Sequence, residues 1–114
     1  MAQQAQGSEL IIGPIVVNAR TRTVKKRDGS VVQFTGAEFN ALHTLVAAMG
    51  APVSRADLCR SALGRAPSDL RLDRSVDQLV FSLRAKLPRD DDGQVLIRSV
   101  RGFGYWIREA DVQA

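Results

Sequence analysis

The spacing of hydrophobic positions divides this chain into short strands, then helices, then a final pair of strands. Near the amino terminus, apolar and β-branched runs separated by turn residues predict four strands, at residues 10–12, 15–18, 23–26 and 31–34. Asp28-Gly29 lies between the last two runs, and this pair is typical of a tight hairpin because both residues tolerate positive φ. We therefore expect a small antiparallel sheet at the start of the domain.

Two helices are predicted after this sheet, and each has a recognisable start. Thr35 and Glu38 have the spacing of a capping box, and Gly50 is placed to end the helix that they open. The expected buried face of this helix consists of Phe39, Leu42, Val46 and Met49. Ser54 is placed to cap a second, shorter helix that ends near residue 63. That helix is expected to bury Ala56, Leu58 and Cys59.

A third helix is predicted over residues 74–87, with Asp73 as its cap and Pro88 just beyond its end. Its apolar residues fall on one stripe, formed by Val76, Leu79, Val80, Leu83 and Leu87. The opposite face carries Arg74, Gln78, Phe81, Ser82 and Ala85. This pattern indicates a helix that is buried on one side and presents the other side to a partner.

The chain ends in a predicted hairpin that carries an arginine in its turn. The strands are expected over residues 95–100 and 105–108, around the glycine-rich turn from Arg101 to Gly104. Four strands, three helices and a hairpin form an α+β arrangement. We expect a flexible tail or linker remnant over residues 1–8, the folded domain over 9–109 and a short tail over 110–114.

Composition and charge favour a negatively charged partner. The 114 residues suit one domain with a single core, and 45% hydrophobic and 25% charged residues are ordinary for a globular protein. The net charge is +4 and the isoelectric point is near 10.0, with the basic excess at both ends of the domain and residues 36–70 balanced. Such an excess favours nucleic acid as the partner without requiring it.

The sequence gives no indication of a membrane span, a disulfide or a catalytic centre. No run approaches the roughly 18 apolar residues of a membrane span, and Cys59 is the single cysteine, so we expect a cytoplasmic protein without a membrane partner. His43 has no second ligand at metal-binding spacing, and Asp90-Asp91-Asp92 is typical of a solvated turn. We therefore predict no enzyme activity, no metal and no cofactor.

Five short pieces of the sequence, in order and at compatible spacing, resemble the OmpR/PhoB family of transcriptional regulatory DNA-binding domains. They are Phe34–Phe39, Val53–Leu58, Arg74–Asp77, Leu83–Leu87 and Val100–Tyr105. Each piece is weak alone, but the set is highly specific and spans about residues 10–108. The resemblance implies a winged helix-turn-helix fold, with an N-terminal four-stranded antiparallel sheet, three helices and a C-terminal β-hairpin wing.

The same resemblance implies a biological setting. In this family the domain usually follows a phosphorylatable receiver domain in a two-component response regulator. The chain is thus expected to be the effector half of a bacterial phosphorelay regulator, with a receiver domain upstream, or a stand-alone relative. Two copies are expected to bind tandem direct repeats in double-stranded DNA. The loop over residues 64–72 lies where some members contact RNA polymerase.

The resemblance also implies which residues contact DNA. Residues 74–87 would be the recognition helix in the major groove, and the wing over residues 95–108 would place Arg101 in the adjacent minor groove. The implied DNA contacts are Arg74, Ser75, Gln78, Phe81, Ser82, Arg84, Arg101 and Tyr105. Within this set, Arg74, Ser75 and Tyr105 match phosphate contacts.

Several of these residues also have a simpler structural interpretation. Arg74 or Arg84 could pair with an acidic residue on a solvated face, and Arg101 could be an ordinary turn residue. Ser75 could serve only as a helix cap. The ring of Tyr105 could belong to the core while its hydroxyl makes the contact.

The predicted recognition helix departs from the family pattern at three positions. Leu79 stands where many members carry a phosphate-contacting histidine, and Phe81 and Ser82 stand where arginine or another polar residue is common. We hypothesise that Phe81 contacts a thymine methyl group; the alternative is that a neighbouring loop or hairpin covers it. This weakly basic face leaves a second function open, a winged helix that serves protein–protein contacts and has little DNA affinity.

Overall fold

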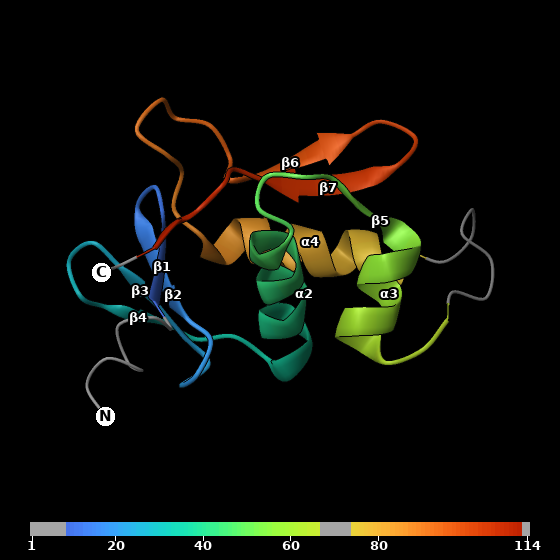
Figure 1. Ribbon diagram of the computed structural model, residues 1–114, viewed down its shortest axis with the longest axis horizontal. Helices are drawn as coiled ribbons and strands as arrows, with labels where there is room; N and C mark the ends of the chain where they lie inside the picture. Colours follow the sequence, from blue (N-terminus) through green and yellow to red (C-terminus); the bar gives the residue numbers. More distant parts are fainter. Residues whose placement is uncertain (1–8, 67–73, 113–114) are drawn as a thin grey trace.

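Two small antiparallel sheets flank three helices in the computed structural model, which describes residues 9–66 and 74–112 (Figure 1). In chain order the elements are β1 (Glu9–Ile12), β2 (Ile15–Asn18), β3 (Thr23–Lys26), β4 (Val31–Val32), α2 (Gly36–Ala47), β5 (Val53–Ser54), α3 (Arg55–Leu63), α4 (Ser75–Lys86), β6 (Ile97–Val100), β7 (Gly104–Ile107) and β8 (Asp111–Val112). The predicted α+β class and the winged-helix order of elements are confirmed. The expected tail over residues 1–8 lies outside the described residues.

The N-terminal sheet has the strand order β4-β3-β2-β1-β8. Val17 lies opposite Leu10 on one side and Val24 on the other, so one face of the sheet carries a row of apolar side chains toward the helices. The fifth strand, β8, falls within the tail expected over residues 110–114: Asp111 pairs with Ile11, and Ala110 just before the strand is buried. β4 covers only two residues of the predicted strand over 31–34.

The predicted caps of α2 and α3 are present. The Thr35 side chain accepts a hydrogen bond from the Glu38 amide at 3.1 Å, and the Glu38 carboxylate accepts one from the Thr35 amide at 2.8 Å. The Ser54 hydroxyl caps α3 in the same way. The prediction that Met49 belongs to the buried face of α2 is wrong, because the helix ends before it and Met49 turns outward at φ +53°.

The wing attaches to the helical core through β5. The second sheet has the order β5-β7-β6, in which Val53 lies opposite Tyr105 and Ser54 opposite Gly104. β6 is shorter than predicted, since it begins at Ile97, and β7 lies one position earlier than predicted, from Gly104 to Ile107. Figure 1 shows the β6–β7 hairpin above the helices, with its turn on the same side of the molecule as α3.

The three helices and both sheets share one hydrophobic core. Its fully buried side chains come from every layer and include Ile12 and Ile15 of the sheet, Leu42 and Leu45 of α2, Leu58 of α3, Leu83 of α4 and Ile107 of the wing. α2 packs against both α3 and α4. None of the helices in the described part of the chain has the length and apolar character that a membrane span requires.

Candidate nucleic-acid interface

The outward face of α4 is the first part of the candidate interface. Val76, Val80 and Leu83 are buried, and Leu79 packs against the core from a half-buried position, as the apolar stripe predicts. Arg74, Gln78, Phe81 and Ala85 are exposed on the other side. The structure thus presents one face of α4 over its whole length.

Phe81 is the most exposed large hydrophobic residue in the described chain, with 74% of its surface accessible. The alternative that a loop or hairpin covers it is wrong. A shallow hollow of about 450 Å³ adjoins its ring, between the end of α4 and the chain that enters β6. An apolar ring in the middle of an outward helix face is available for contact with an apolar group of a partner.

The start of α4 differs in detail from the prediction. Arg74 occupies the N-cap position and makes no side-chain cap bond, while Asp73, the predicted cap, lies outside the described residues. The Ser75 hydroxyl lies 3.1 Å from Nη2 of Arg65, which donates to it across the loop between α3 and α4. Ser82 is half-buried on the flank of the helix. Two arginines, Arg65 and Arg74, therefore lie at the positive end of α4.

Arg84 points from α4 to the wing. Its Nε donates to the Ile97 carbonyl oxygen at 3.0 Å, and its Nη2 donates to the Ser99 hydroxyl at 2.9 Å. The guanidinium also lies 5.5 Å from the centre of the Tyr105 ring. Three contacts within the protein hold this predicted DNA contact against β6 and β7.

Tyr105 belongs to the core at its ring and to an ionic cluster at its hydroxyl. The residue is 7% exposed, and the hydroxyl donates a hydrogen bond to Oδ1 of Asp77. The same carboxylate accepts from Nε of Arg55 at 3.0 Å and from Nη2 at 2.8 Å. Neither Arg55 nor Asp77 was predicted to be a functional residue, although both lie in the pieces that resemble the family.

The cluster shifts the pKa of each of its members. Burial alone would raise the pKa of Asp77, but hydrogen bonds from Tyr105 and Arg55 outweigh it and lower the pKa. Burial raises the pKa of Tyr105, and the hydrogen bond to the Asp77 carboxylate raises it further. The hydrogen bond to Asp77 raises the pKa of Arg55. At neutral pH the cluster therefore consists of a carboxylate, a guanidinium and a neutral phenol.

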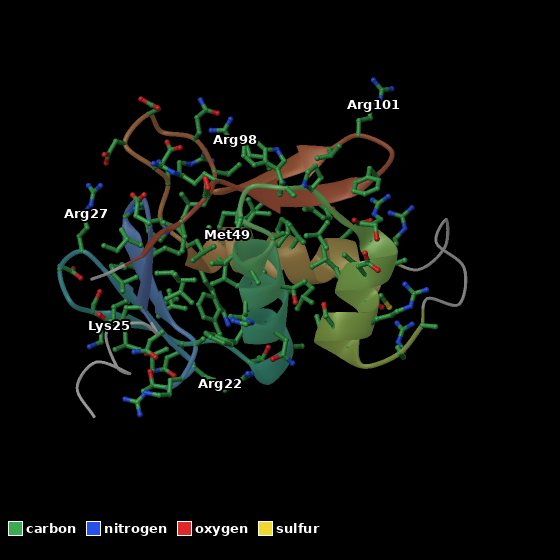
Figure 2. All side chains as sticks on the ribbon, in the orientation of Figure 1. Arg22, Lys25, Arg27, Met49, Arg98 and Arg101 are labelled. Carbon is green, nitrogen blue, oxygen red and sulfur yellow. The ribbon has the colours of Figure 1, made fainter. Side chains whose placement is uncertain are left out.

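The tip of the wing is the second part of the candidate interface. Arg101 is exposed in the turn between β6 and β7, and Figure 2 shows its side chain pointing away from the rest of the molecule. Gly102 follows at φ +75°, and Phe103 is 48% exposed. Trp106, further along β7, is half-buried, with the Arg98 guanidinium 5.9 Å from its ring. The turn therefore presents an exposed arginine and a half-exposed phenylalanine.

Other candidate features do not assemble into a site. No group of three or more potential metal ligands occurs among residues 9–66 and 74–112. His43 stacks on Phe39 with 6.1 Å between ring centres, and Cys59 is buried. Most of the loop predicted to contact RNA polymerase, residues 67–72, lies outside the described residues.

Comparison with known proteins assigns the chain to a family. The family model described as "Transcriptional regulatory protein, C terminal" matches residues 29–107. The chain therefore belongs to this family, the OmpR/PhoB-type effector domains of response regulators, as the five sequence pieces indicated.

Its relatives include longer regulators. The chain is 35% identical over 99 residues to the probable transcriptional regulator ycf27 of Cyanophora paradoxa, covering 87% of this chain and 41% of the relative. It is 37% identical over 78 residues to the transcriptional regulatory protein CpxR of Escherichia coli strain K12, covering 68% of this chain and 33% of the relative. The chain thus spans well under half the length of these relatives.

Solved structures share the fold. The DNA-binding domain of CpxR from E. coli superposes with a TM-score of 0.79 at 31% identity, over 90% of this chain and 98% of that one. The DNA-binding domain of RstA from Klebsiella pneumoniae, solved in complex with the RstA box, gives a TM-score of 0.74 at 27% identity, over 88% and 96% of the two chains.

Proposed function

We propose that this chain binds double-stranded DNA sequence-specifically and regulates transcription as the effector half of a phosphorelay response regulator. The observation that carries the proposal is the exposed face of α4 beside a wing whose tip presents Arg101. The major groove admits one α-helix, and a narrow minor groove attracts an arginine. The complex of the related RstA domain with the RstA box supports the same partner.

In this proposal the predicted contacts divide into two groups. Arg74, Ser75, Gln78, Phe81 and Ser82 face the major groove or its phosphates, and Arg101 enters the minor groove. Arg84 and Tyr105 support the reading surface from inside, because their polar atoms are bonded to other parts of the protein. Among the predicted contacts, Arg74 and Arg101 then supply the electrostatic attraction to the DNA.

The finer features of the proposal follow from family membership. We propose that two copies bind tandem direct repeats, that residues 64–72 contact RNA polymerase, and that a receiver domain precedes this domain in a longer cytoplasmic protein. The relatives that are more than twice as long as the matched segment support the presence of a further domain.

The salt dependence of DNA binding tests the proposed function. A duplex selected from a random library should bind the chain, and its affinity should fall by about 10²-fold between 50 and 200 mM salt if roughly four phosphates are contacted. Fluorescence anisotropy with a labelled duplex measures the slope. Negligible binding to every duplex at 50 mM salt would contradict the proposal and favour the protein–protein module.

Replacing Phe81 by alanine tests the proposed thymine contact. We expect about fivefold weaker binding to the selected duplex, because burial of a ring edge against a methyl group contributes about 1 kcal/mol. Replacing the contacted thymine by deoxyuridine should weaken the unaltered chain equally and leave Phe81→Ala unaffected. Met49→Ala is the control, since Met49 is exposed in the turn after α2. Equal affinities of Phe81→Ala and the unaltered chain for all duplexes would contradict this contact.

A further inference from the structure

The two proposed readers, α4 and the wing, are connected by a continuous series of side-chain contacts. One end of the series is the Asp77 carboxylate on α4, which accepts from Tyr105 of the wing and from Arg55 of α3. The other end is Arg84, two helical turns further along α4, which bonds to β6 and lies against the Tyr105 ring. Tyr105 is thus held at its hydroxyl and at its ring by the same helix.

Arg55 of α3 bonds to both the wing and α4. Its backbone amide donates to the Phe103 carbonyl oxygen in the wing turn at 3.2 Å, while its guanidinium holds Asp77. A single residue at the start of α3 therefore bonds to the wing tip through its backbone and to α4 through its side chain. The backbone contact, at Phe103, lies two residues from Arg101, which is proposed to enter the minor groove. The side-chain contact lies on α4, the helix proposed to enter the major groove.

The Asp77 carboxylate accepts hydrogen bonds from both Arg55 and Tyr105, which is more than a simple ion pair requires. The side chains of Arg55 and Asp77 are 39% and 36% exposed, and pairs of this exposure add little to folding stability. A carboxylate that accepts hydrogen bonds from a phenol hydroxyl and from two guanidinium nitrogens is, however, fixed in orientation. Such a network restricts how the wing can move relative to the helix.

From this geometry we infer that Asp77 and Tyr105 are positioning residues for DNA recognition, which hold the wing and α4 at one relative orientation so that both grooves are read together. This inference rests on the proposed function. Its physical basis is that a preformed pair of readers loses less conformational entropy on binding than a helix with a mobile wing. Once α4 is seated in the major groove, Arg101 is already at the minor groove, so the two contacts reinforce each other.

The decisive experiment measures how strongly the Arg101 contact depends on the Tyr105 hydroxyl. Tyr105→Phe removes that hydroxyl and keeps the ring beneath Arg84. In the otherwise unaltered chain, Arg101→Ala should weaken binding to the selected duplex about tenfold. In the Tyr105→Phe background, Arg101→Ala should weaken binding only about twofold, because the wing is no longer held in a fixed orientation relative to α4. Asp77→Asn should reproduce the effect of Tyr105→Phe.

A matched control separates positioning from loss of stability. Thr44→Val removes a hydroxyl that bonds to the Asn40 carbonyl oxygen at 2.8 Å and to Ser61 at 3.0 Å, between α2 and α3. This variant can lower the thermal midpoint, but it should leave the tenfold cost of Arg101→Ala intact. If Tyr105→Phe binds DNA and also keeps the full cost of Arg101→Ala, the positioning inference is overturned and DNA binding stands.

Hydrogen exchange provides a second readout in the absence of DNA. The amides of Arg55 and Phe103, which bond to the wing turn, should exchange about tenfold faster in Tyr105→Phe, whereas the Leu45 amide in α2 should not change. Unchanged exchange at Arg55 and Phe103 would overturn the inference. Failure of the unaltered chain to bind any duplex would overturn the proposed function and, with it, this inference.

Discussion

Gly104→Ala is expected to lower the free energy of unfolding by about 3 kcal/mol, or to detach the wing from the core, because no space exists for a methyl group there. A Cβ atom at this position would overlap the Val53 carbonyl oxygen and lie 3.0 Å from the Ser54 Cα atom. Both obstacles are backbone atoms of β5, so they cannot move aside by a change of rotamer. The β5–β7 pairing that attaches the wing would have to open.

Urea denaturation of the variant and of Gly36→Ala measures this effect. Gly36 begins α2 with open space around its Cα atom and no positive φ, so alanine should leave stability unchanged or raise it by up to about 1 kcal/mol. The same methyl group thus has opposite expected consequences at the two glycines. Equal stability of both variants would show that β5 and β7 are not in close contact in solution.

Glu38→Ala is expected to lower the free energy of unfolding by about 2 kcal/mol, because one buried carboxylate makes two stabilising interactions. It completes the capping box of α2, and it accepts a hydrogen bond at 2.7 Å from Nζ of Lys86 at the end of α4. The Glu38 side chain is only 7% exposed, so removal of the carboxylate leaves a partly buried ammonium group without its partner. Asp91→Asn is the control, since the Arg27–Asp91 pair is fully exposed and its loss should not change the midpoint of unfolding.

The charge of Glu38 should also appear in the pH dependence of stability. Burial alone would raise the pKa of Glu38, but hydrogen bonds from Lys86 and Thr35 outweigh it and lower the pKa. The carboxylate form is therefore favoured in the folded state. Its stabilising contribution is present above the ordinary glutamate pKa of about 4.3 and is lost as pH falls through the lowered value.

Glu38→Gln separates the contribution of the Glu38 charge to stability from the contribution of its capping hydrogen bond. Its amide oxygen can still accept from the Thr35 backbone, but it cannot titrate. Urea midpoints measured between pH 7 and pH 3 should therefore fall less steeply for Glu38→Gln than for the unaltered chain, with Asp77 contributing to the remaining slope. A slope identical to that of the unaltered chain would show that the Lys86–Glu38 pair does not form in solution.

The elements of the fold could be predicted closely because their signals are local. Thr35 with Glu38, and Ser54 before α3, satisfy backbone groups three residues away, so the residue types alone indicate where the helices begin. Errors occurred where a long-range contact decides the structure. Asp111 lies in a strand only because it pairs with Ile11, one hundred positions earlier, and the short local sequence carries no strand signal.

The candidate site was predicted less completely. The outward positions of Arg74, Gln78, Phe81 and Arg101 follow from periodicity and turn chemistry, and the structure exposes all four. The internal bonding of Arg84 does not follow from periodicity. An arginine on the flank of a helix can extend either to solvent or to a neighbouring strand, and its partners Ile97 and Ser99 are 13 and 15 residues away.

The sequence by itself therefore determined the order of elements, the buried stripe of α4 and the family to which the chain belongs, since periodicity, caps and motif spacing are properties of neighbouring residues. Only the tertiary structure decided which polar side chains turn inward to hold the wing. Asp77 meets Arg55 across 22 residues and Tyr105 across 28. Their contact exists because α3, α4 and β7 pack around one core, and no local pattern encodes that meeting.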